Sequence, residues 1–590
     1  MPELSLLLDH LTYLYGPAAG QVAFERLRDI IERYRQEIPP PVDQGRDRYL
    51  LSERDSILIT YADQVRKPGQ TPLSTLVEFC QSHLQGLISA IHLLPFYPWS
   101  SDDGFSVIDY RSVDPALGSW MDIDRLGASF HLMFDAVINH VSARHNWFQR
   151  FLQDDPNYQA YFISVKGDPD LSSVVRPRAL PLLTRFETLS GPKQLWTTFS
   201  EDQVDLNYQN MDVLLEIVNT LLFYAKRGAR FIRLDAIAYL WKEIGTPSIH
   251  LPQTHRIIQL FRDVLDIVAP HVLLITETNV PHEQNVSYFG DGTNEAQLVY
   301  NFALPPLVLH AFQTGEARIL SEWSAGLTLP SRGVTFFNFL ASHDGIGVSP
   351  ARGILDEKEI GALIAQIQSH GGFISYKHNP DGTQSAYELN INYFDALSNQ
   401  ESGEASGLQV DRFLAAQAIM LSIAGIPGIY FHSLFGSRGW PEGVRETGRN
   451  RSINRQKLDR AGLERALADP LSLRHQVFHR FAGMLRARAG SPAFHPFGGQ
   501  KILDLSEAVF AVLRRSTDGS RVALCLHNVT NRQQQVVPDW QEIFGAVSPP
   551  LEDLISRLSV SQGPGGEVLL QPYQVAWLAQ PAAQIDRSLS

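Results

Sequence analysis

The sequence predicts an α/β fold: a (β/α)8 TIM barrel with small domains inserted in its βα loops, followed by a C-terminal antiparallel β domain. The main observation is that short apolar strand candidates alternate with longer amphipathic stretches, the pattern of repeated βα units. Eight such candidates occur, the number that closes this kind of barrel. They span residues 56–61, 90–95, 131–136, 231–235, 273–277, 298–302, 336–341 and 426–431.

The connections between these strands are uneven in length. The segment between the third and fourth strands is far longer than one helix requires, so we expect a small inserted domain over the barrel mouth at about 151–207. A second insertion, at about 346–408, follows the seventh strand. Long βα loops usually carry function rather than stability. With these insertions, the barrel spans residues 51–494.

The start of the chain differs from the barrel. Residues 1–50 are predicted to form a helical extension, because Leu27, Ile31 and Tyr34 recur at helical spacing before a run of prolines. A cap docked on the barrel is expected, and a regulatory role stays open.

The end of the chain has a sequence pattern that differs from both the barrel and the N-terminal extension. Residues 495–590 are predicted to form a small antiparallel β domain. They contain short β-type runs at 509–513, 522–526 and 574–578, and an Asp-Gly pair between the first two is typical of a hairpin turn.

Composition and charge exclude several classes of protein. The 44% of hydrophobic residues argues against disorder, and a formal net charge of −13 leaves no basic surplus for a nucleic-acid partner. No apolar run is long enough for a membrane span, and the start of the chain lacks a secretory signal, so a soluble cytoplasmic protein is expected. Cys80 and Cys525 are expected to be buried free thiols, with no disulfide or thiolate metal site. The oligomeric state stays open.

Three strand candidates end in acidic residues: Asp235, Glu277 and Asp344. Because the carboxyl ends of barrel strands meet at one mouth, we expect these carboxylates to share a site. Arg233 lies two residues before Asp235 and so points to the same face, where it can keep that acid ionised. A buried structural ion pair is an equal alternative for this motif taken alone.

A fourth polar cluster, Asp-Ala-Val-Ile-Asn-His at 135–140, ends the third strand candidate. Alone it is a weak signal, and a structural helix start is an equal alternative. Together, the four clusters fall in order at the ends of strands three, four, five and seven. This order indicates one active site.

The four clusters resemble the signature regions of the α-amylase superfamily of glycoside hydrolases, glycoside hydrolase family 13. The resemblance covers nearly the whole chain from about residue 51. It implies that Asp235 is the nucleophile, Glu277 the general acid/base and Asp344 the transition-state stabiliser of a retaining reaction. Arg233 would then keep Asp235 anionic, and neighbouring negative charge would raise the pKa of Glu277.

Finer motifs resemble the sucrose phosphorylase group. Asp102 and Phe105 are similar to that group's glucose-binding loop, in which the aspartate holds the distal hydroxyls and the phenylalanine forms an apolar wall. Arg455 ends a segment, at 449–455, similar to the loop whose final arginine pairs with that aspartate. This pairing would close the pocket behind one glucosyl unit. The resemblance also places His140, Phe199, Gln203, Tyr239 and His343 in the glucose site, with ordinary core packing as the alternative for each aromatic residue.

In a phosphorylase, phosphate replaces water as the acceptor, and a dianion near three carboxylates needs cations. Arg176 and Arg178 lie in a segment that resembles the group's mobile loop, whose second arginine binds phosphate. A solvated loop is the alternative. Tyr387 matches the tyrosine of the facing loop. The chemistry requires no cofactor and no metal, and whether Asn139 binds calcium stays open.

Two departures from the sucrose phosphorylase pattern place sucrose in doubt. Asn279 stands where that group has a histidine, and Glu388 where it has a glutamine, both beside the phosphate and leaving group. The sequence around Asn279 and the N-terminal extension are more similar to the glucosylglycerate phosphorylase branch, which cleaves 2-O-α-glucosyl-glycerate with phosphate. The resemblance implies the products α-glucose 1-phosphate and glycerate. The anionic acceptor needs a cation, for which Arg178, Lys377 and His378 are candidates.

Three alternatives remain open at this point. The first is a sucrose or sucrose 6-phosphate phosphorylase. The second keeps the glucosyl-enzyme but uses water or another sugar as acceptor, which gives a hydrolase or transglucosidase. The third is a non-catalytic barrel that acts as a scaffold, disfavoured because all three acids are present.

Overall fold

The computed structural model describes residues 4–38, 51–177, 180–378 and 383–581. At its centre, eight parallel strands form a closed barrel in the order β1-β17-β13-β12-β11-β10-β4-β3, which confirms the predicted fold class. Nearly every strand residue is buried because helices cover the outside and side chains fill the inside. The strands are β1 (Ile57–Thr60), β3 (Ala90–Leu93), β4 (His131–Ala136), β10 (Ala229–Leu234), β11 (Leu273–Thr276), β12 (Leu298–Tyr300), β13 (Thr335–Phe339) and β17 (Ile426–Tyr430).

Each strand coincides with one of the eight predicted from the sequence, and the ends differ by a few residues. One difference matters for the site. The acidic residues are not the last residues of their strands but lie just beyond them, in the βα loops at the barrel mouth. Strand register brings Arg233 of β10 beside Asp135 of β4.

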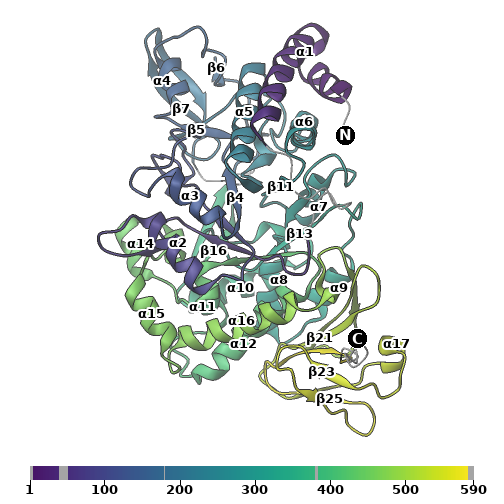
Figure 1. Cartoon of the computed structure of the whole chain (residues 1–590). Helices are drawn as coiled ribbons and strands as arrows, with labels where there is room; N and C mark the ends of the chain where they lie inside the picture. Colours follow the sequence, from purple (N-terminus) through teal and green to yellow (C-terminus); the bar gives the residue numbers. More distant parts are fainter. Residues whose placement is uncertain (1–3, 39–50, 178–179, 379–382, 582–590) are drawn as a thin grey trace.

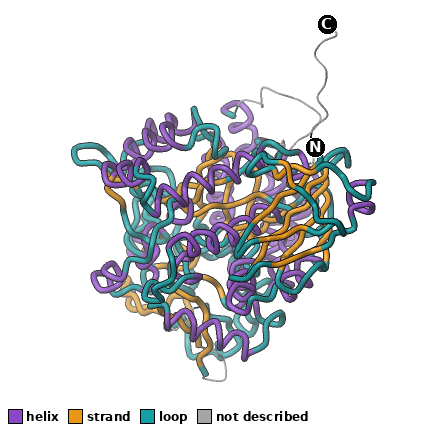
Figure 2. The backbone as a smooth tube through the Cα atoms, turned by 90° about the horizontal axis from the view of Figure 1, so that it is seen from below, coloured by secondary structure: helices purple, strands orange, loops and turns teal. Residues whose placement is uncertain are grey.

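Helices surround the barrel, as Figures 1 and 2 show. Their apolar faces pack on the strands and their polar faces meet solvent. The longer helices are α2 (Pro72–His83), α3 (Trp120–Gly127), α5 (Met211–Lys226), α6 (Pro252–Val268), α8 (Leu304–Thr314), α9 (Arg318–Ala325), α12 (Ser406–Ser422), α15 (Arg460–Ala468) and α16 (Leu473–Ala489). Short elements between them are β2 (Val65–Arg66), α7 (His282–Val286), α13 (Phe431–Leu434), α14 (Pro441–Thr447) and β18 (Leu458–Asp459).

The two long connections carry small sheets of their own. In the first, β6, β8 and β7 form one antiparallel sheet, and β5 pairs with β9. In the second, β14, β16 and β15 form another. The elements are β5 (His140–Ser142), α4 (Asn146–Leu152), β6 (Ser164–Val165), β7 (Leu183–Thr188), β8 (Gly191–Trp196), β9 (Gln203–Asp205), β14 (Ile346–Gly347), α10 (Glu357–Ser369), β15 (Phe373–His378), β16 (Gln384–Asn390) and α11 (Tyr393–Leu397).

The N-terminal helix α1 (Leu4–Glu37) packs against α5 and α6 (Figure 1). Gly16, with a φ of 79°, and the following Pro17 kink it. The hydroxyl of Tyr15 donates to the carbonyl of Tyr208 at 3.0 Å, so the helix is tied to the first insertion as well as to the barrel helices.

The last part of the chain forms an antiparallel sheet in the order β19-β20-β21-β26-β23-β24, with a separate β22-β25 pair, at the bottom of Figure 1. Gly519, with a φ of 73°, lies in the predicted turn between β20 and β21. The elements are β19 (Gly499–Leu503), β20 (Val509–Arg515), β21 (Val522–Asn528), β22 (Gln534–Val536), α17 (Trp540–Phe544), β23 (Leu551–Asp553), β24 (Ser559–Val560), β25 (Val568–Leu570) and β26 (Val575–Ala579).

Candidate active site

One pocket at the barrel mouth, here called the inner pocket, collects most of the predicted site residues. Those that line it are Asp102, Phe105, His140, Phe199, Gln203, Asp235, Tyr239, Glu277, Asn279, His343, Asp344, Tyr387 and Glu388. Arg233 is buried next to this pocket in contact with Asp235, and Arg455 lines an adjoining outer hollow. Arg178 lies outside the described residues.

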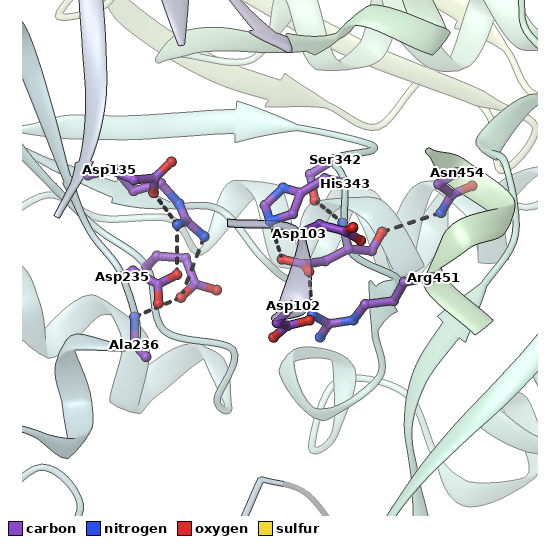
Figure 3. Close-up of polar contacts among 12 residues, drawn as sticks. Asp102, Asp103, Asp135, Asp235, Ala236, Ser342, His343, Arg451 and Asn454 are labelled. Carbon is purple, nitrogen blue, oxygen red and sulfur yellow. Dashed lines mark hydrogen bonds and ion pairs between the residues drawn. The ribbon is translucent and has the colours of Figure 1, made fainter. Parts of the chain in front are cut away.

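Arg233 contacts both reacting acids, and Figure 3 shows one of them, Asp235, near Asp135 and the backbone of Ala236. Its Nη1 lies 2.7 Å from Oδ1 of Asp235 and also contacts Asp135, while its Nη2 lies 3.7 Å from Oε2 of Glu277. Glu277 additionally accepts from the backbone N–H of Ala236 at 3.1 Å. The guanidinium, only 2% exposed, therefore holds both carboxylates in place. It stabilises the negative charge of Asp235 more than that of Glu277, because Asp235 is closer.

Behind this arginine, a buried pair completes the support. Nε2 of His92 lies 2.7 Å from Oδ2 of Asp135, and both side chains are fully buried. Burial alone raises the pKa of Asp135, but Arg233 and His92 outweigh it and hold that pKa below its ordinary value. Asp135 is thus an ionised anchor for Arg233 rather than a reacting group.

Burial is the largest influence on the two reacting acids. It raises the pKa of Asp235 to about 8, against the opposing effect of Arg233, and Glu277 raises that pKa further. Arg233 thus acts on Asp235 in the predicted direction, but in the empty pocket burial outweighs it. Burial also raises the pKa of Glu277, with Asp344 adding to the effect, so the predicted direction for Glu277 is confirmed.

These shifts belong to a coupled pair of carboxylates that share protons. Because Arg233 lies 1 Å closer to Asp235 (2.7 against 3.7 Å), the singly protonated pair places its negative charge on Asp235 and its proton on Glu277. This arrangement supplies one anionic and one protonated carboxyl group, as a retaining glycosidic reaction requires.

Asp344, in contrast to the two reacting acids, has a lowered pKa and is held ionised. Although burial opposes ionisation, Arg451 leads the groups that keep the pKa of Asp344 well below its ordinary value. Nη1 of Arg451 lies 2.7 Å from Oδ1 of Asp344, and Nε2 of His343 lies 3.3 Å from Oδ2. Burial lowers the pKa of His343 to about 3, so its imidazole is neutral near neutral pH.

Aromatic rings and amides form the wall of the inner pocket. Phe105 stacks on His343 with ring centroids 4.8 Å apart, and Phe199 contacts the ring of His140 at 5.2 Å. Nε2 of Gln203 donates to the carbonyl of Phe105 at 2.9 Å. The predicted aromatic residues therefore line a cavity beside the acids in addition to packing on one another.

The structure pairs Arg455 with Asp103 rather than with the expected Asp102. Asp102 and Asp103 both have left-handed backbones, with φ values of 55° and 51°. This turn aims Asp103 at Arg455, whose Nε also donates to the carbonyl of His343 at 2.8 Å. Asp102 lines both the inner pocket and the outer hollow. Strained residues of this kind are typical of functional loops.

The residues predicted for the acceptor lie on the side of the inner pocket formed by the second insertion and the loop after β11. Asn279 is packed against Gly347, and its buried Oδ1 has no hydrogen-bond partner among the described residues. Tyr387 and Glu388, on β16, line both cavities. Lys377 is not among the residues that line either cavity, and the side chain of His378 lies outside the description.

Sequence reasoning missed Arg451. It lies inside the arginine-rich segment that pointed to Arg455, yet it is Arg451 that reaches the inner pocket. Its guanidinium bridges Asp344 and Glu388, which both lie in the long connection between β13 and β17. The repeated arginines were a signal, but only the folded loops show which one reaches the acids.

From the sequence, Asn139 is a possible calcium ligand. Its amide oxygen accepts from the ammonium of Lys242 at 2.6 Å, and this ammonium also lies 2.7 Å from Asp205. Among the described residues, no group of three or more histidine, cysteine or acidic side chains is placed to hold a metal ion. A buried lysine thus provides the positive charge beside Asn139.

Within the described part of the chain, no helix is both long and apolar enough to cross a membrane.

The barrel and its three acids define an α-amylase-type enzyme, and comparison with known proteins agrees. Residues 82–344 match the family model of the alpha-amylase catalytic domain. The chain is 50% identical to the glucosylglycerate phosphorylase of Spirochaeta thermophila, over 97% of this chain and 100% of that protein. It is 31% identical to the sucrose phosphorylase of Agrobacterium vitis, over 74% of this chain and 88% of that protein.

The solved structure of sucrose 6F-phosphate phosphorylase from Thermoanaerobacter thermosaccharolyticum matches with a TM-score of 0.71 and 25% identity, covering 82% of this chain and 96% of that one. The chain belongs to the α-amylase superfamily, glycoside hydrolase family 13, in the group that contains the glucosylglycerate and sucrose phosphorylases.

Proposed function

We propose that this enzyme is a retaining α-glucoside phosphorylase that cleaves 2-O-α-glucosyl-glycerate with inorganic phosphate. The products are α-glucose 1-phosphate and glycerate. The main support for this substrate is the 50% identity to a glucosylglycerate phosphorylase along its whole length. The identity to a sucrose phosphorylase is 31%, over a shorter span. The inner pocket, which has five acidic residues and a single arginine among its described lining residues, supports the reaction.

In the first step, a carboxylate oxygen of Asp235 attacks the anomeric carbon of the glucosyl unit. The bond from that carbon to the glycerate oxygen breaks, and Glu277 transfers its proton to this oxygen. Asp344, held ionised, stabilises the positive charge that develops on the sugar ring. The products of this step are a glucosyl ester of Asp235 and free glycerate.

In the second step, an oxygen of hydrogen phosphate attacks the same carbon from the face that glycerate has left. The ester bond to Asp235 breaks, and the proton of the attacking phosphate passes to Glu277, which restores the starting state. Two inversions give α-glucose 1-phosphate. Arg233, 2.7 Å from Asp235, stabilises the carboxylate that leaves.

The N-terminal helix, the barrel and the C-terminal sheet are proposed as three units, with boundaries near residues 50 and 495. We also propose that the enzyme works in the cytoplasm, where the charged sugar phosphate product is retained.

A panel of acceptors tests the substrate. The enzyme is incubated with α-glucose 1-phosphate and D-glycerate, fructose, fructose 6-phosphate or glycerol, and phosphate release is measured. We expect the highest kcat/KM with D-glycerate. Phosphate release with fructose but not with D-glycerate would overturn the assignment, and equal release without any acceptor would make the enzyme a hydrolase.

A further inference from the structure

Arg451 stands at the boundary between the inner pocket and the outer hollow. It lines both cavities, and so do Tyr387 and Glu388 of β16. It is also the one lysine or arginine among the described residues that line the inner pocket. Any anion that passes from the outer hollow toward the anomeric carbon therefore meets this guanidinium.

The contacts of Arg451 show that it is placed to bind carboxylates. Its Nε lies 3.0 Å from Oε2 of Glu388, and its Nη2 contacts the other oxygen of the same carboxylate, so this ion pair is bidentate. Its Nη1 lies 2.7 Å from Oδ1 of Asp344. A planar guanidinium offers five N–H donors in a fork that matches carboxylate and phosphate groups.

From this geometry we infer that Arg451 receives the carboxylate of the acceptor and, after the acceptor has left, the phosphate that replaces it. The inference rests on the proposed function, because it assigns the anion-binding role within that site. Glu388 and Asp344 hold the guanidinium in place, and Glu388 occupies the carboxylate position while the pocket is empty.

One cation can serve both anions because they are never bound at the same time. In a retaining double displacement, the leaving acceptor and the incoming phosphate occupy the same face of the anomeric carbon in succession. Both are anions that enter a pocket lined by several carboxylates, and each needs a compensating positive charge. Arg451 supplies that charge next to Asp344.

A purely structural role makes a different prediction. If Arg451 only keeps Asp344 ionised and in place, its replacement slows glucosyl transfer to every acceptor by the same factor. If it binds the acceptor anion, the loss is larger for anionic than for neutral acceptors.

The test compares Arg451→Lys and Arg451→Gln with the wild-type enzyme, with α-glucose 1-phosphate as donor. D-glycerate is the anionic acceptor, and glycerol and water are the neutral ones. Exchange of labelled phosphate into α-glucose 1-phosphate gives the KM for phosphate. Arg445→Gln is the matched control. Arg445 lies on α14, in the same connection after β17 as Arg451, is 70% exposed and pairs with Glu442.

We expect both Arg451 variants to lose at least tenfold more kcat/KM with D-glycerate than with glycerol or water, and to raise the KM for phosphate at least tenfold. The lysine variant, which keeps the charge near Asp344, should slow hydrolysis less than the glutamine variant does. Arg445→Gln should match the wild type in all assays.

Equal losses with all acceptors, or an unchanged KM for phosphate, would overturn the inference while leaving the proposed function intact. A wild-type enzyme that transfers glucose neither to D-glycerate nor to phosphate would instead refute the proposed function itself.

Discussion

At the residue scale, burial sets the chemistry of the two reacting acids more than any single charge does. Arg233 lies within hydrogen-bond distance of Asp235, yet desolvation still raises the pKa of that acid to about 8. The empty pocket therefore holds carboxylates that are costly to ionise. A positively charged transition state relieves this cost, so part of the catalytic advantage is built in before substrate binds.

Because ionisation of the buried Asp235 is unfavourable, we expect Asp235→Asn to stabilise the protein in a pH-dependent way. The pKa of Asp235 is 3.8 ordinarily and about 8 in the folded protein, so the folded state binds more protons than the unfolded state between these values. Its ionisation therefore reduces the stability of the wild type as the pH rises from about 4 to 8. The Tm of the inactive variant should exceed that of the wild type by more at pH 8 than at pH 5, by a few degrees in calorimetry. A Tm difference independent of pH would contradict the raised pKa.

Glu277→Gln separates the acid role from binding. A good leaving group such as fluoride needs no proton, whereas glycerate does. The variant should therefore lose about 10²–10⁴-fold in kcat with the glucosyl-glycerate and much less with α-glucosyl fluoride in the presence of phosphate. A similar loss with both donors would remove Glu277 from the acid role.

At the scale of elements, the second insertion shapes the acceptor side of the pocket. β14 brings Gly347 against Asn279 so closely that an added Cβ would lie 2.5 Å from its Oδ1. Gly347→Ala must displace Asn279, and we expect a several-fold higher KM for D-glycerate with a smaller change in hydrolysis. Gly361→Ala on α10, where nothing lies within 4 Å, is the control and should behave as the wild type. An unchanged KM in Gly347→Ala would show that Asn279 does not contact the acceptor.

The elements were predictable where a local pattern decides the structure. The eight barrel strands are short, mostly apolar runs that alternate with longer amphipathic stretches, and this pattern located them. The partner of Arg455 was not predictable, because it depends on two consecutive left-handed aspartates that no periodicity reports. Arg451 was missed for a related reason: its partners, Asp344 and Glu388, lie in the connection between β13 and β17, far from it in the sequence. The raised pKa of Asp235 was not predictable either, because it depends on how deeply the carboxyl group is buried, and the sequence does not show this.

At the scale of the whole molecule, the N-terminal helix belongs to the same packed body as the barrel. The helix packs against α5 and α6, and its Leu27 is fully buried, whereas its Val22 is 48% exposed. We expect Leu27→Ala to lower the free energy of unfolding by about 2–5 kcal/mol, because it leaves a cavity, and Val22→Ala to change it little. Urea unfolding measures both. Equal, small effects would mean that α1 contributes little to the stability of the barrel.

We propose that the enzyme transfers glucose from glycerate to phosphate through Asp235 and retains its α configuration. Proton NMR of purified enzyme with 2-O-α-glucosyl-glycerate and phosphate, recorded from the first turnovers, tests this transfer directly. We expect α-glucose 1-phosphate and glycerate in equal amounts, strictly dependent on phosphate, with no turnover by Asp235→Asn. Release of free glucose at the same rate without phosphate, or β-glucose 1-phosphate as the first product, would contradict it.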